Sequence, residues 1–269
     1  MVNEMVISSA NGPIFLQFPG LLQFPELFHG VFTRKGGVSE GPFKSLNSSL
    51  GVGDRPQHVE ENRRRMTGRC HGLMPVFPKQ VHGKSVYVLL GEKTEALPHH
   101  RSSRFEADAV VTGTPGVALG IQVADCQPVI LYDPVKRIVA NVHSGWRGSI
   151  ENILSVTLAA MREGFGSAPK NIHAGIGPSL GPCCAEFVNF RDEIPKRYWA
   201  YKDSRDHFDF WSISRDQLAA EGVKTENIYT SGLCTRCRTD LFFSYRGEGT
   251  TGRFAALAGV RPPLLRFIA

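Results

Sequence analysis

The sequence has no long hydrophobic run. Although 42% of its 269 residues are hydrophobic, no stretch approaches the roughly 18 consecutive apolar residues that a membrane-spanning helix needs. The first residues, MVNEMVISSANGPIFLQF, also lack the cationic region and the continuous apolar run of a secretory signal. We therefore expect a soluble, globular, cytoplasmic protein that has no membrane partner and is large enough to bury a substantial core.

Cysteine is scarce, with six residues in the chain. So few cysteines do not make a disulfide scaffold, and their uneven spacing does not match a four-thiolate zinc ribbon, so we expect reduced thiols. Cys183 and Cys184 are adjacent, which is a poor arrangement for zinc, and the segment around them is rich in turn residues. Cys234 and Cys237 form one C-x-x-C motif without a second pair. Neither pair is predicted to bind a metal or to act in redox chemistry.

The charge is only moderately basic. The formal net charge is +6 and the isoelectric point is near 9.1, and acidic residues are interspersed along the chain. A basic balance favours anionic partners. No helix-turn-helix, zinc-finger or RNA-binding signature accompanies it, so we exclude nucleic acid as a partner. A phosphorylated or phosphate-using substrate fits the charge better.

The chain shows no internal repeat and no low-complexity linker, which favours one domain over residues 1–269. Short β-rich runs bounded by Gly, Pro or Asp predict strands. These strands are expected at residues 85–90, 109–112, 117–123, 129–132 and 138–143. Because several follow one another with connections of a few residues, the pattern favours a mixed α+β layered fold over a doubly wound parallel sheet.

Three helices are predicted between these strands and around them. The first covers residues 54–67, with Asp54 as its cap, and the second covers 149–163. The third covers 214–221, where Ser214 and Gln217 have the spacing of a capping box. The polar stretch 91–105 is expected to be an exposed loop.

Reactive side chains stand at the ends of the predicted strands. Cys126 lies between the apolar runs VALGIQV and PVILY, and His143 ends the run RIVANV, 17 residues later. Two adjacent strands joined by a tight turn would bring both residues to one end of a sheet. His82 also precedes a predicted strand, and Gly83 after it permits close backbone approach.

Three ligands of the His and Cys type leave a fourth position for water or substrate, which is the requirement of a catalytic zinc ion. We therefore predict one zinc ion held by His82, Cys126 and His143, with copper as a less favoured ion. The spacing alone leaves another interpretation open. A strand-end Cys is often a small buried hydrophobe, and a His often only satisfies hydrogen bonds.

Two glycine-rich segments are candidates for binding an anion. In HSGWRGSI, Arg147 stands just before the predicted helix that begins near Ser149, and a helix N-terminus with an arginine suits phosphate. The segment FTRKGGVSEGPFKSLN contributes Arg34 and Asn47. In both segments, a simple turn with a solvent-facing arginine is the alternative. The candidate substrate and phosphate contacts are Arg34, Asn47, Gln80 and Arg147.

Several segments occur in the order that is typical of one known family. They are HGVFTRKGGVSEGPFKSLN, GVGDRPQHVEENRRR, KQVHG, ADAVVT, VADCQPVILYDP, VHSGWRG, IGPSLGPCCAEF and CTRCRTDLFFSYRGEGTTGR. From about His29 to Gly259 the chain resembles the laccase-domain family. This family is also called the multicopper polyphenol oxidoreductase laccase-like or purine nucleoside phosphorylase family, and it is related to a peptidoglycan editing factor.

The resemblance implies a four-layer α/β/β/α sandwich with mixed sheets. It also implies a single zinc ion bound by the His of QVHG, the Cys of ADC and the His that precedes GWRG by two positions, which are His82, Cys126 and His143 here. The activities it implies are phosphorolysis of adenosine, inosine and methylthioadenosine, and deamination of adenosine. Two departures bear on substrate preference: Ser144 replaces the usual Ala, and Gly247 stands where a second Arg is common.

The leading hypothesis is therefore cleavage of a purine N-glycosidic bond by phosphate, with purine nucleoside and phosphate as partners and a monomer favoured. Arg147 and Arg34 would hold the phosphate, while zinc would polarise a substrate oxygen or generate hydroxide. Asp125, beside Cys126, would shuttle a proton or orient a ligand, and His143 completes the catalytic set.

Three alternatives stay open. The first is a copper-dependent polyphenol oxidase (laccase), although a multicopper centre needs many more His ligands. The second is a metal-free hydrolase with Cys126 as nucleophile and His143 as base, oriented by Asp125 or Asn141. The third is a noncatalytic protein that edits or binds cell-wall precursors.

Overall fold

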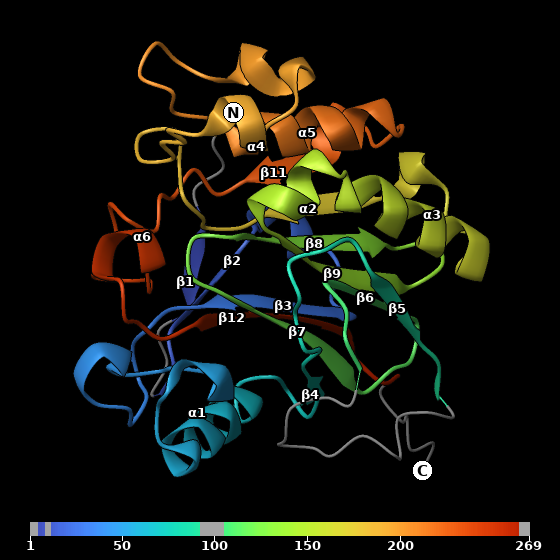
Figure 1. The fold of residues 1–269 in the computed structure, drawn as a ribbon. Helices are drawn as coiled ribbons and strands as arrows, with labels where there is room; N and C mark the ends of the chain where they lie inside the picture. Colours follow the sequence, from blue (N-terminus) through green and yellow to red (C-terminus); the bar gives the residue numbers. More distant parts are fainter. Residues whose placement is uncertain (1–4, 9–11, 92–104, 264–269) are drawn as a thin grey trace, which may run out of the picture.

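The computed structural model describes residues 5–8, 12–91 and 105–263, and its centre is a pair of stacked mixed sheets (Figure 1). The first sheet has the spatial order β1 (Val6–Ser8), β2 (Phe15–Gln17), β3 (Leu27–Phe32), β12 (Phe254–Val260), β7 (Val117–Val123) and β4 (Met74–Val76). The second has the order β11 (Ile228–Thr230), β10 (His173–Ile176), β8 (Gln127–Asp133), β9 (Ile138–Ser144), β6 (Ala109–Thr112) and β5 (Val86–Leu89).

The two sheets bury their inner faces against each other. On β9, Val139 belongs to this inner core, and Asn141 donates from its Nδ2 to backbone oxygens of β7 and β12 in the opposite sheet. Ala140 and Val142 point to the other side of the same strand. Because side chains alternate along a strand, His143 faces the same inter-sheet space as Asn141, at the end of β9.

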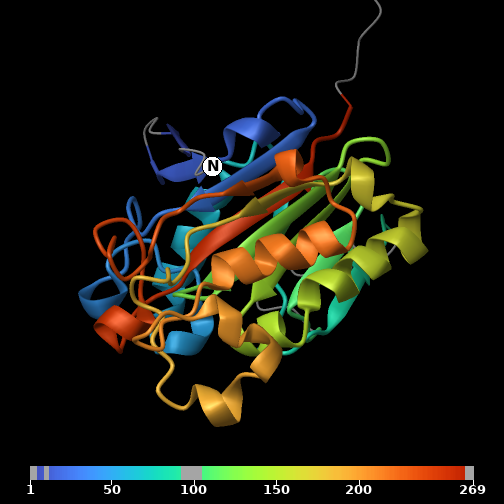
Figure 2. The same cartoon turned by 90° about the horizontal axis from the view of Figure 1, so that it is seen from above.

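Helices cover both outer faces of the pair. Along the second sheet lie α2 (Trp146–Ile150), α3 (Ile153–Phe165) and α5 (Phe210–Ala220) (Figures 1 and 2). The apolar side chains of α3 and α5 pack on β8 and β9. The outer face of the first sheet is covered by α1 (Pro56–Thr67), with Met66 in contact with the phenylalanines of β3. The predicted four-layer α/β/β/α arrangement with mixed sheets is confirmed.

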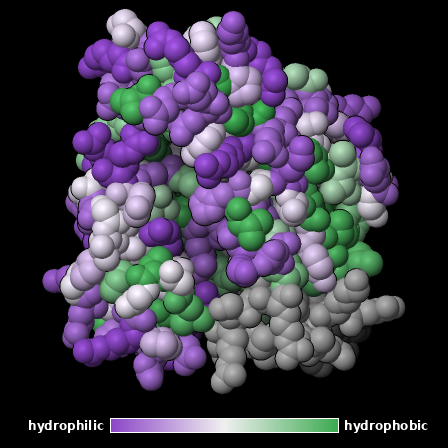
Figure 3. All heavy atoms as spheres, viewed as in Figure 1, coloured by the Kyte–Doolittle hydropathy of each residue, from purple (hydrophilic) through white to green (hydrophobic). Residues whose placement is uncertain are grey.

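Shorter helical segments connect these layers. Two are α-helical, α4 (Phe190–Glu193) and α6 (Tyr245–Glu248). The 3-10 turns span Pro19–Leu21, Gly41–Phe43, Leu50–Val52, Pro169–Asn171, Lys196–Tyr201 and Thr225–Asn227. No helix within the described ranges combines the length and the apolar character that crossing a bilayer requires. On the face shown in Figure 3, hydrophilic residues predominate and hydrophobic ones form small separate groups.

The five predicted strands are all present. The strands at 109–112 and 117–123 have the predicted bounds, while β8 and β9 extend one or two residues beyond them. The runs at β6 to β9 are recognisable because these strands are buried on both faces and are therefore apolar almost throughout. Most of the predicted loop at 91–105, namely 92–104, lies outside the described residues.

Three helix boundaries were predicted wrongly. Asp54 does not cap α1, because Arg55 occupies the cap position and the Asp54 carboxylate accepts hydrogen bonds from Ser39 and Asn47. α5 begins at Phe210 and is capped by Asp209. The supposed capping-box pair is buried inside α5, where Ser214 donates to Gln127 and Gln217 donates to the backbone of Ser149. The helix expected over 149–163 is two helices separated by Asn152 in the left-handed conformation.

Candidate metal centre

Two loops and the end of strand β9 bring the predicted ligands together at one end of the sheet pair. In the β8–β9 hairpin Pro128 pairs with His143, so Cys126, just before β8, comes to the same end as His143. His82 belongs to the loop between β4 and β5 and has a left-handed backbone, with φ of 61°. The ligand atoms of the three residues all lie within 4.8 Å of one another. The structure therefore assembles the predicted set.

Gly145 makes room for this convergence. A Cβ atom at this position would lie 3.3 Å from Cys126 Sγ, 3.4 Å from His82 Cδ2 and 3.9 Å from His143 Cε1. Its φ of −71° is accessible to any residue, so the requirement for glycine here is space rather than backbone conformation.

Asp108 is the residue that holds the ligands in place, and the sequence analysis did not identify it. Its carboxylate accepts hydrogen bonds from His143 Nδ1 at 2.8 Å and from the backbone N–H groups of His82 at 2.9 Å and Gly83 at 2.7 Å. The backbone N–H of His143 also donates to the Asp108 carbonyl oxygen, at 2.6 Å. The sequence feature that could have identified Asp108 is the acidic residue of ADAVVT, directly before a predicted strand.

The hydrogen bonds of Asp108 fix the tautomer of His143. Burial would raise the pKa of Asp108, but His143 and the N–H of Gly83 outweigh burial and hold that pKa below its ordinary value. The carboxylate is therefore ionised and accepts a hydrogen bond from Nδ1–H, which leaves Nε2 as the ring nitrogen that can bind a metal. A carboxylate on the second nitrogen of a ligating histidine is the usual support of a zinc site.

Charge attraction within the cluster favours a thiolate at Cys126. Burial opposes this by raising the pKa of the thiol, but the adjacent His143 and His82 outweigh burial and lower it. For His143, burial lowers the pKa, while Cys126 and Asp108 raise it further than burial lowers it. A thiolate is the form of cysteine that binds metals and attacks electrophiles.

These donors fit a catalytic zinc ion. Two imidazoles and one thiolate from three separate segments supply three ligands, which leaves a fourth position for water or substrate. The carboxylate of Asp108 supplies the outer support.

A cavity of about 820 Å³ opens over the three ligands, a size suited to a small molecule. Aromatic side chains form part of its wall, namely Phe77, Trp146, Phe187, Phe210 and Tyr245. Cationic side chains form another part, namely Arg63, Lys79, Arg246 and Arg253. The cavity therefore combines surfaces for a flat ring and for an anion beside the ligand cluster.

Two further predicted residues line this cavity, but their polar atoms are engaged. The Gln80 amide exchanges two hydrogen bonds of 2.8 Å with the backbone of Gln122. The Asp125 carboxylate accepts from the hydroxyls of Thr235 at 2.6 Å and Ser244 at 2.7 Å, and from the backbone N–H of Arg246 at 2.6 Å. Asp125 therefore anchors the C-terminal loops to the Cys126 segment.

The other three predicted contacts lie outside the cavity wall. Arg34 donates to Glu248 at 2.7 Å and to the backbone of Thr239. Asn47 is buried, and its Oδ1 accepts from the backbone N–H of Arg253 at 2.8 Å. Arg147 is exposed, with its guanidinium 4.6 Å from the centre of a Trp146 ring.

The helix terminus expected to bind the anion is also absent from the predicted place. The helix begins at Trp146, not near Ser149, and it ends after five residues because Asn152 turns the chain. The hydroxyl of Ser144, which replaces the usual Ala of the family, lies 2.9 Å from that of Ser149.

Arg253 is a cation of the site that the prediction missed. It directly precedes β12, and its Nη1 donates to the backbone oxygens of Thr251 and Gly252. Burial lowers the pKa of Arg253, and the negative groups of Cys126 and Asp125 partly offset this. Its charge is therefore within electrostatic reach of the ligand cluster. In the sequence, the feature that could have identified Arg253 is its place at the end of the segment GTTGR.

Comparison with known proteins agrees with this architecture. Residues 28–261 match the family described as multi-copper polyphenol oxidoreductase laccase. The chain belongs to this family. It is 38% identical over 232 residues to the purine nucleoside phosphorylase YfiH of Escherichia coli, covering 83% of this chain and 90% of that protein. It is 34% identical over 247 residues to the purine nucleoside phosphorylase YlmD of Geobacillus stearothermophilus, covering 86% and 89%.

Solved structures of family members share the fold. The Bacillus licheniformis YfiH structure superposes with a TM-score of 0.85 at 28% identity, covering 95% of this chain and 99% of that one. The Geobacillus stearothermophilus YlmD structure gives a TM-score of 0.81 at 32% identity, covering 95% and 98%.

The copper in the family's description is not matched by a cluster of histidines in the part of the chain that the structure describes. There, two groups of side chains are placed to hold a metal: the His82, Cys126 and His143 set, and a group of four cysteines. A multicopper oxidase would require several more histidine ligands near one another.

Proposed function

We propose that this protein is a zinc-dependent purine nucleoside phosphorylase, which converts adenosine, inosine or methylthioadenosine and phosphate into the free base and the sugar 1-phosphate. The observation that carries the proposal is the cavity itself, in which aromatic and cationic walls meet over His82, Cys126 and His143. The names of the relatives support the same reaction. The proposed setting is the cytoplasm, where the six cysteines stay reduced.

The residues of the cavity have distinct roles in this proposal. Phosphate oxygen forms a bond to the sugar C1′ as the bond from C1′ to the purine breaks, and the released base takes up a proton. Trp146 and Phe187 provide faces for the purine ring, and Arg253 holds the phosphate. Holding both substrates in one cavity supplies much of the rate enhancement, because the reaction becomes effectively unimolecular.

The second part of the proposal concerns the metal that His82, Cys126 and His143 would bind. These three residues would hold a zinc ion that would supply Lewis acidity, a chemistry that also suits deamination of adenosine. Asp108 keeps His143 in the tautomer that exposes Nε2, and Gly145 keeps the three ligands close. Asp125, whose carboxylate already accepts three hydrogen bonds, positions the loop of Cys126 and is not assigned proton transfer.

A second candidate function has a specific observation in its favour. Cys126, His143 and Asp108 form the series of nucleophile, base and orienting carboxylate that a metal-free hydrolase uses. The orienting residue in this alternative is Asp108, because Asn141 donates to the backbone of the opposite sheet and Asp125 is engaged elsewhere.

One set of assays separates these functions. The purified protein is incubated with adenosine, inosine or methylthioadenosine, with and without phosphate, and bases, sugar phosphates and inosine are separated chromatographically. Phosphate-dependent release of base that is lost after zinc removal and restored by zinc supports the proposal. Phosphate-independent release that survives zinc removal but not thiol alkylation supports the hydrolase. Copper-dependent oxidation of a polyphenol without any base release would support the oxidase.

A further inference from the structure

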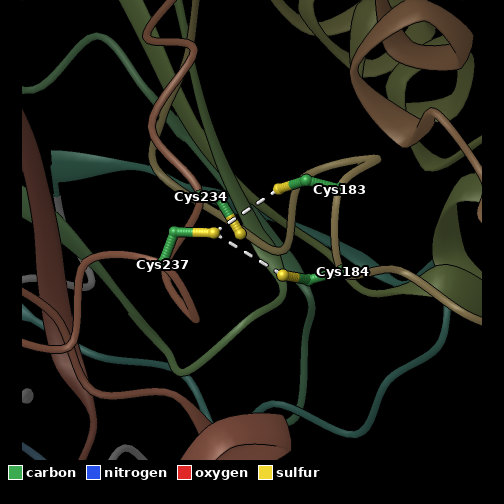
Figure 4. A group of neighbouring side chains, drawn as sticks. All are labelled: Cys183, Cys184, Cys234 and Cys237. Atoms are coloured by element: carbon green, nitrogen blue, oxygen red, sulfur yellow. Dashed lines mark hydrogen bonds between the residues drawn. The ribbon is translucent and has the colours of Figure 1, made fainter.

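The two cysteine pairs, 50 residues apart in sequence, meet in space. Cys183 and Cys184 follow β10, and Cys234 and Cys237 follow β11. Since β10 and β11 are parallel neighbours, the segments after them leave the sheet at the same end. An isolated bridge between Ser179 and Cys234 continues the pairing beyond the sheet. Figure 4 shows the four side chains directed toward a common centre.

The distances among the sulfur atoms match a tetrahedral metal site. Cys237 Sγ lies 3.6 Å from Cys183 Sγ and 3.6 Å from Cys184 Sγ, and all four sulfur atoms lie within 4.8 Å of one another. In a tetrahedral zinc site with Zn–S bonds of about 2.3 Å, neighbouring sulfur atoms are about 3.8 Å apart. We propose that Cys183, Cys184, Cys234 and Cys237 bind a second, structural zinc ion as a closed tetrathiolate site.

The surroundings of the cluster favour a metal over a disulfide. The Sγ of Cys237 is equidistant from two partners, whereas a disulfide joins one pair at about 2.05 Å and leaves the other thiols unused. The backbone N–H of Gly181 donates to Cys234 Sγ at 3.3 Å, which is the kind of outer contact that supports a metal-bound thiolate. Four soft sulfur ligands in a tetrahedral arrangement select zinc or iron over harder ions, and a single mononuclear zinc ion fits the 3.6 Å separations.

A metal ion at this position would stabilise the loops that support the cavity beside Cys126. Both cysteine segments contact Asp125: the backbone N–H of Leu180 donates to its carbonyl oxygen at 2.8 Å, and Thr235 donates to its carboxylate at 2.6 Å. Asp125 precedes the ligand Cys126. The second ion would therefore cross-link two loops that both support the first ligand cluster, and its binding energy would add to the stability of the fold.

The test is the metal content of the full-length protein, purified under reducing conditions without added metal. The wild type is expected to hold about two zinc ions per chain, and Cys237→Ser about one. Cys237 is exposed, so this substitution opens no cavity in the core. Cys126→Ser is expected to lose the other ion, and Cys70→Ala, at a buried cysteine outside both clusters, is expected to lose none.

Cobalt substitution gives a readout that is independent of activity. Cobalt bound to four thiolates absorbs strongly through sulfur-to-metal charge transfer, so Cys126→Ser should keep most of this absorbance and Cys237→Ser should lose most of it. Equal metal content in wild type and Cys237→Ser would overturn the proposal. So would an intact mass that shows Cys237 joined to Cys183 or Cys184, or bound iron in place of zinc.

Discussion

Replacing Asp108 with Asn tests whether this carboxylate organises the ligand cluster. Asp108 accepts from His143 Nδ1 at 2.8 Å and from the backbone N–H groups of Val81 at 3.2 Å, His82 at 2.9 Å and Gly83 at 2.7 Å. Asn has the same shape, but its NH₂ group must face either His143 Nδ1 or the N–H of Gly83. In either orientation a donor faces a donor, and the negative charge is lost.

The expected effect is a loss of zinc affinity of about 10-fold to 100-fold, the usual effect of removing an outer-shell partner. This corresponds to about 1.4 to 2.7 kcal/mol, close to the roughly 1.5 to 3 kcal/mol of one charge-assisted hydrogen bond. At limiting zinc, nucleoside cleavage should fall in proportion to occupancy. Excess zinc should restore part of the activity.

The assay is competition for zinc between the protein and a chromophoric chelator, with the melting temperature as a check on folding. Asp133→Asn is a matched control, because Asp133 is also a buried carboxylate that accepts backbone hydrogen bonds, but it lies at the opposite end of β8. This control should lower stability without changing zinc affinity. Unchanged affinity in Asp108→Asn, or an equal loss in Asp133→Asn, would refute the reasoning.

Three further predictions follow from individual contacts. Gly145→Ala should reduce zinc content severalfold because its Cβ would lie 3.3 Å from Cys126 Sγ, closer than an ordinary contact, and would displace this ligand. Gly164→Ala, in open space on α3, should leave zinc content unchanged. Burial lowers the pKa of His29 to about 4, from 6.5 when exposed. Between these two pH values the unfolded chain binds more protons than the folded chain. The free energy of unfolding should therefore fall by about 3 kcal/mol as the pH drops from about 6.5 to about 4. His29→Gln, measured by denaturant unfolding, should flatten that slope, and an unchanged slope would exclude His29 as its source. Arg253→Ala should raise the KM for phosphate at least about 10-fold, the scale of one charge-assisted contact, whereas Arg147→Ala, outside the cavity wall, should change it little; equal effects in steady-state kinetics would contradict this assignment.

The sequence was sufficient to predict those strands and site residues whose positions follow from the local pattern of apolar and turn residues. The strands β6 to β9 are apolar runs bounded by turn residues, so their bounds follow from the pattern. The short turn between β8 and β9 then requires that Cys126 and His143 lie at one end of the sheet, as the structure has them. His82 lies on a different loop. The sequence offers it as a third ligand because it precedes a predicted strand and is followed by Gly83, and the resemblance of QVHG to the family motif supports the same choice.

Features that depend on tertiary pairing were not predictable in the same way. Asp108 is placed by the pairing of β6 with β9, which no local pattern specifies. The helix after Gly145 is interrupted by Asn152, which has the left-handed conformation. Asn tolerates this conformation, but an Asn in the sequence does not by itself predict it. The first of the two helices begins at Trp146 and has only five residues, so Arg147 lies within its first turn rather than ahead of a long helix.

The cysteines show the same limit more clearly. Considered separately, an adjacent pair and a lone C-x-x-C are weak metal motifs. They become one cluster only because β10 and β11 are parallel and adjacent in the second sheet. The pairing of two strands more than 50 residues apart therefore decides whether these residues can share an ion.

The most direct test of the proposed function compares wild type with Cys126→Ser, using methylthioadenosine or adenosine with phosphate as substrates. The account predicts that zinc-loaded wild type releases free base and sugar 1-phosphate in equal amounts, and only when phosphate is present. Cys126→Ser should lose the metal of this centre together with nearly all of this activity, while its fold and the zinc of the four-cysteine cluster are retained. Base release by Cys126→Ser at the wild-type rate, or release by wild type that does not depend on phosphate, would contradict the account.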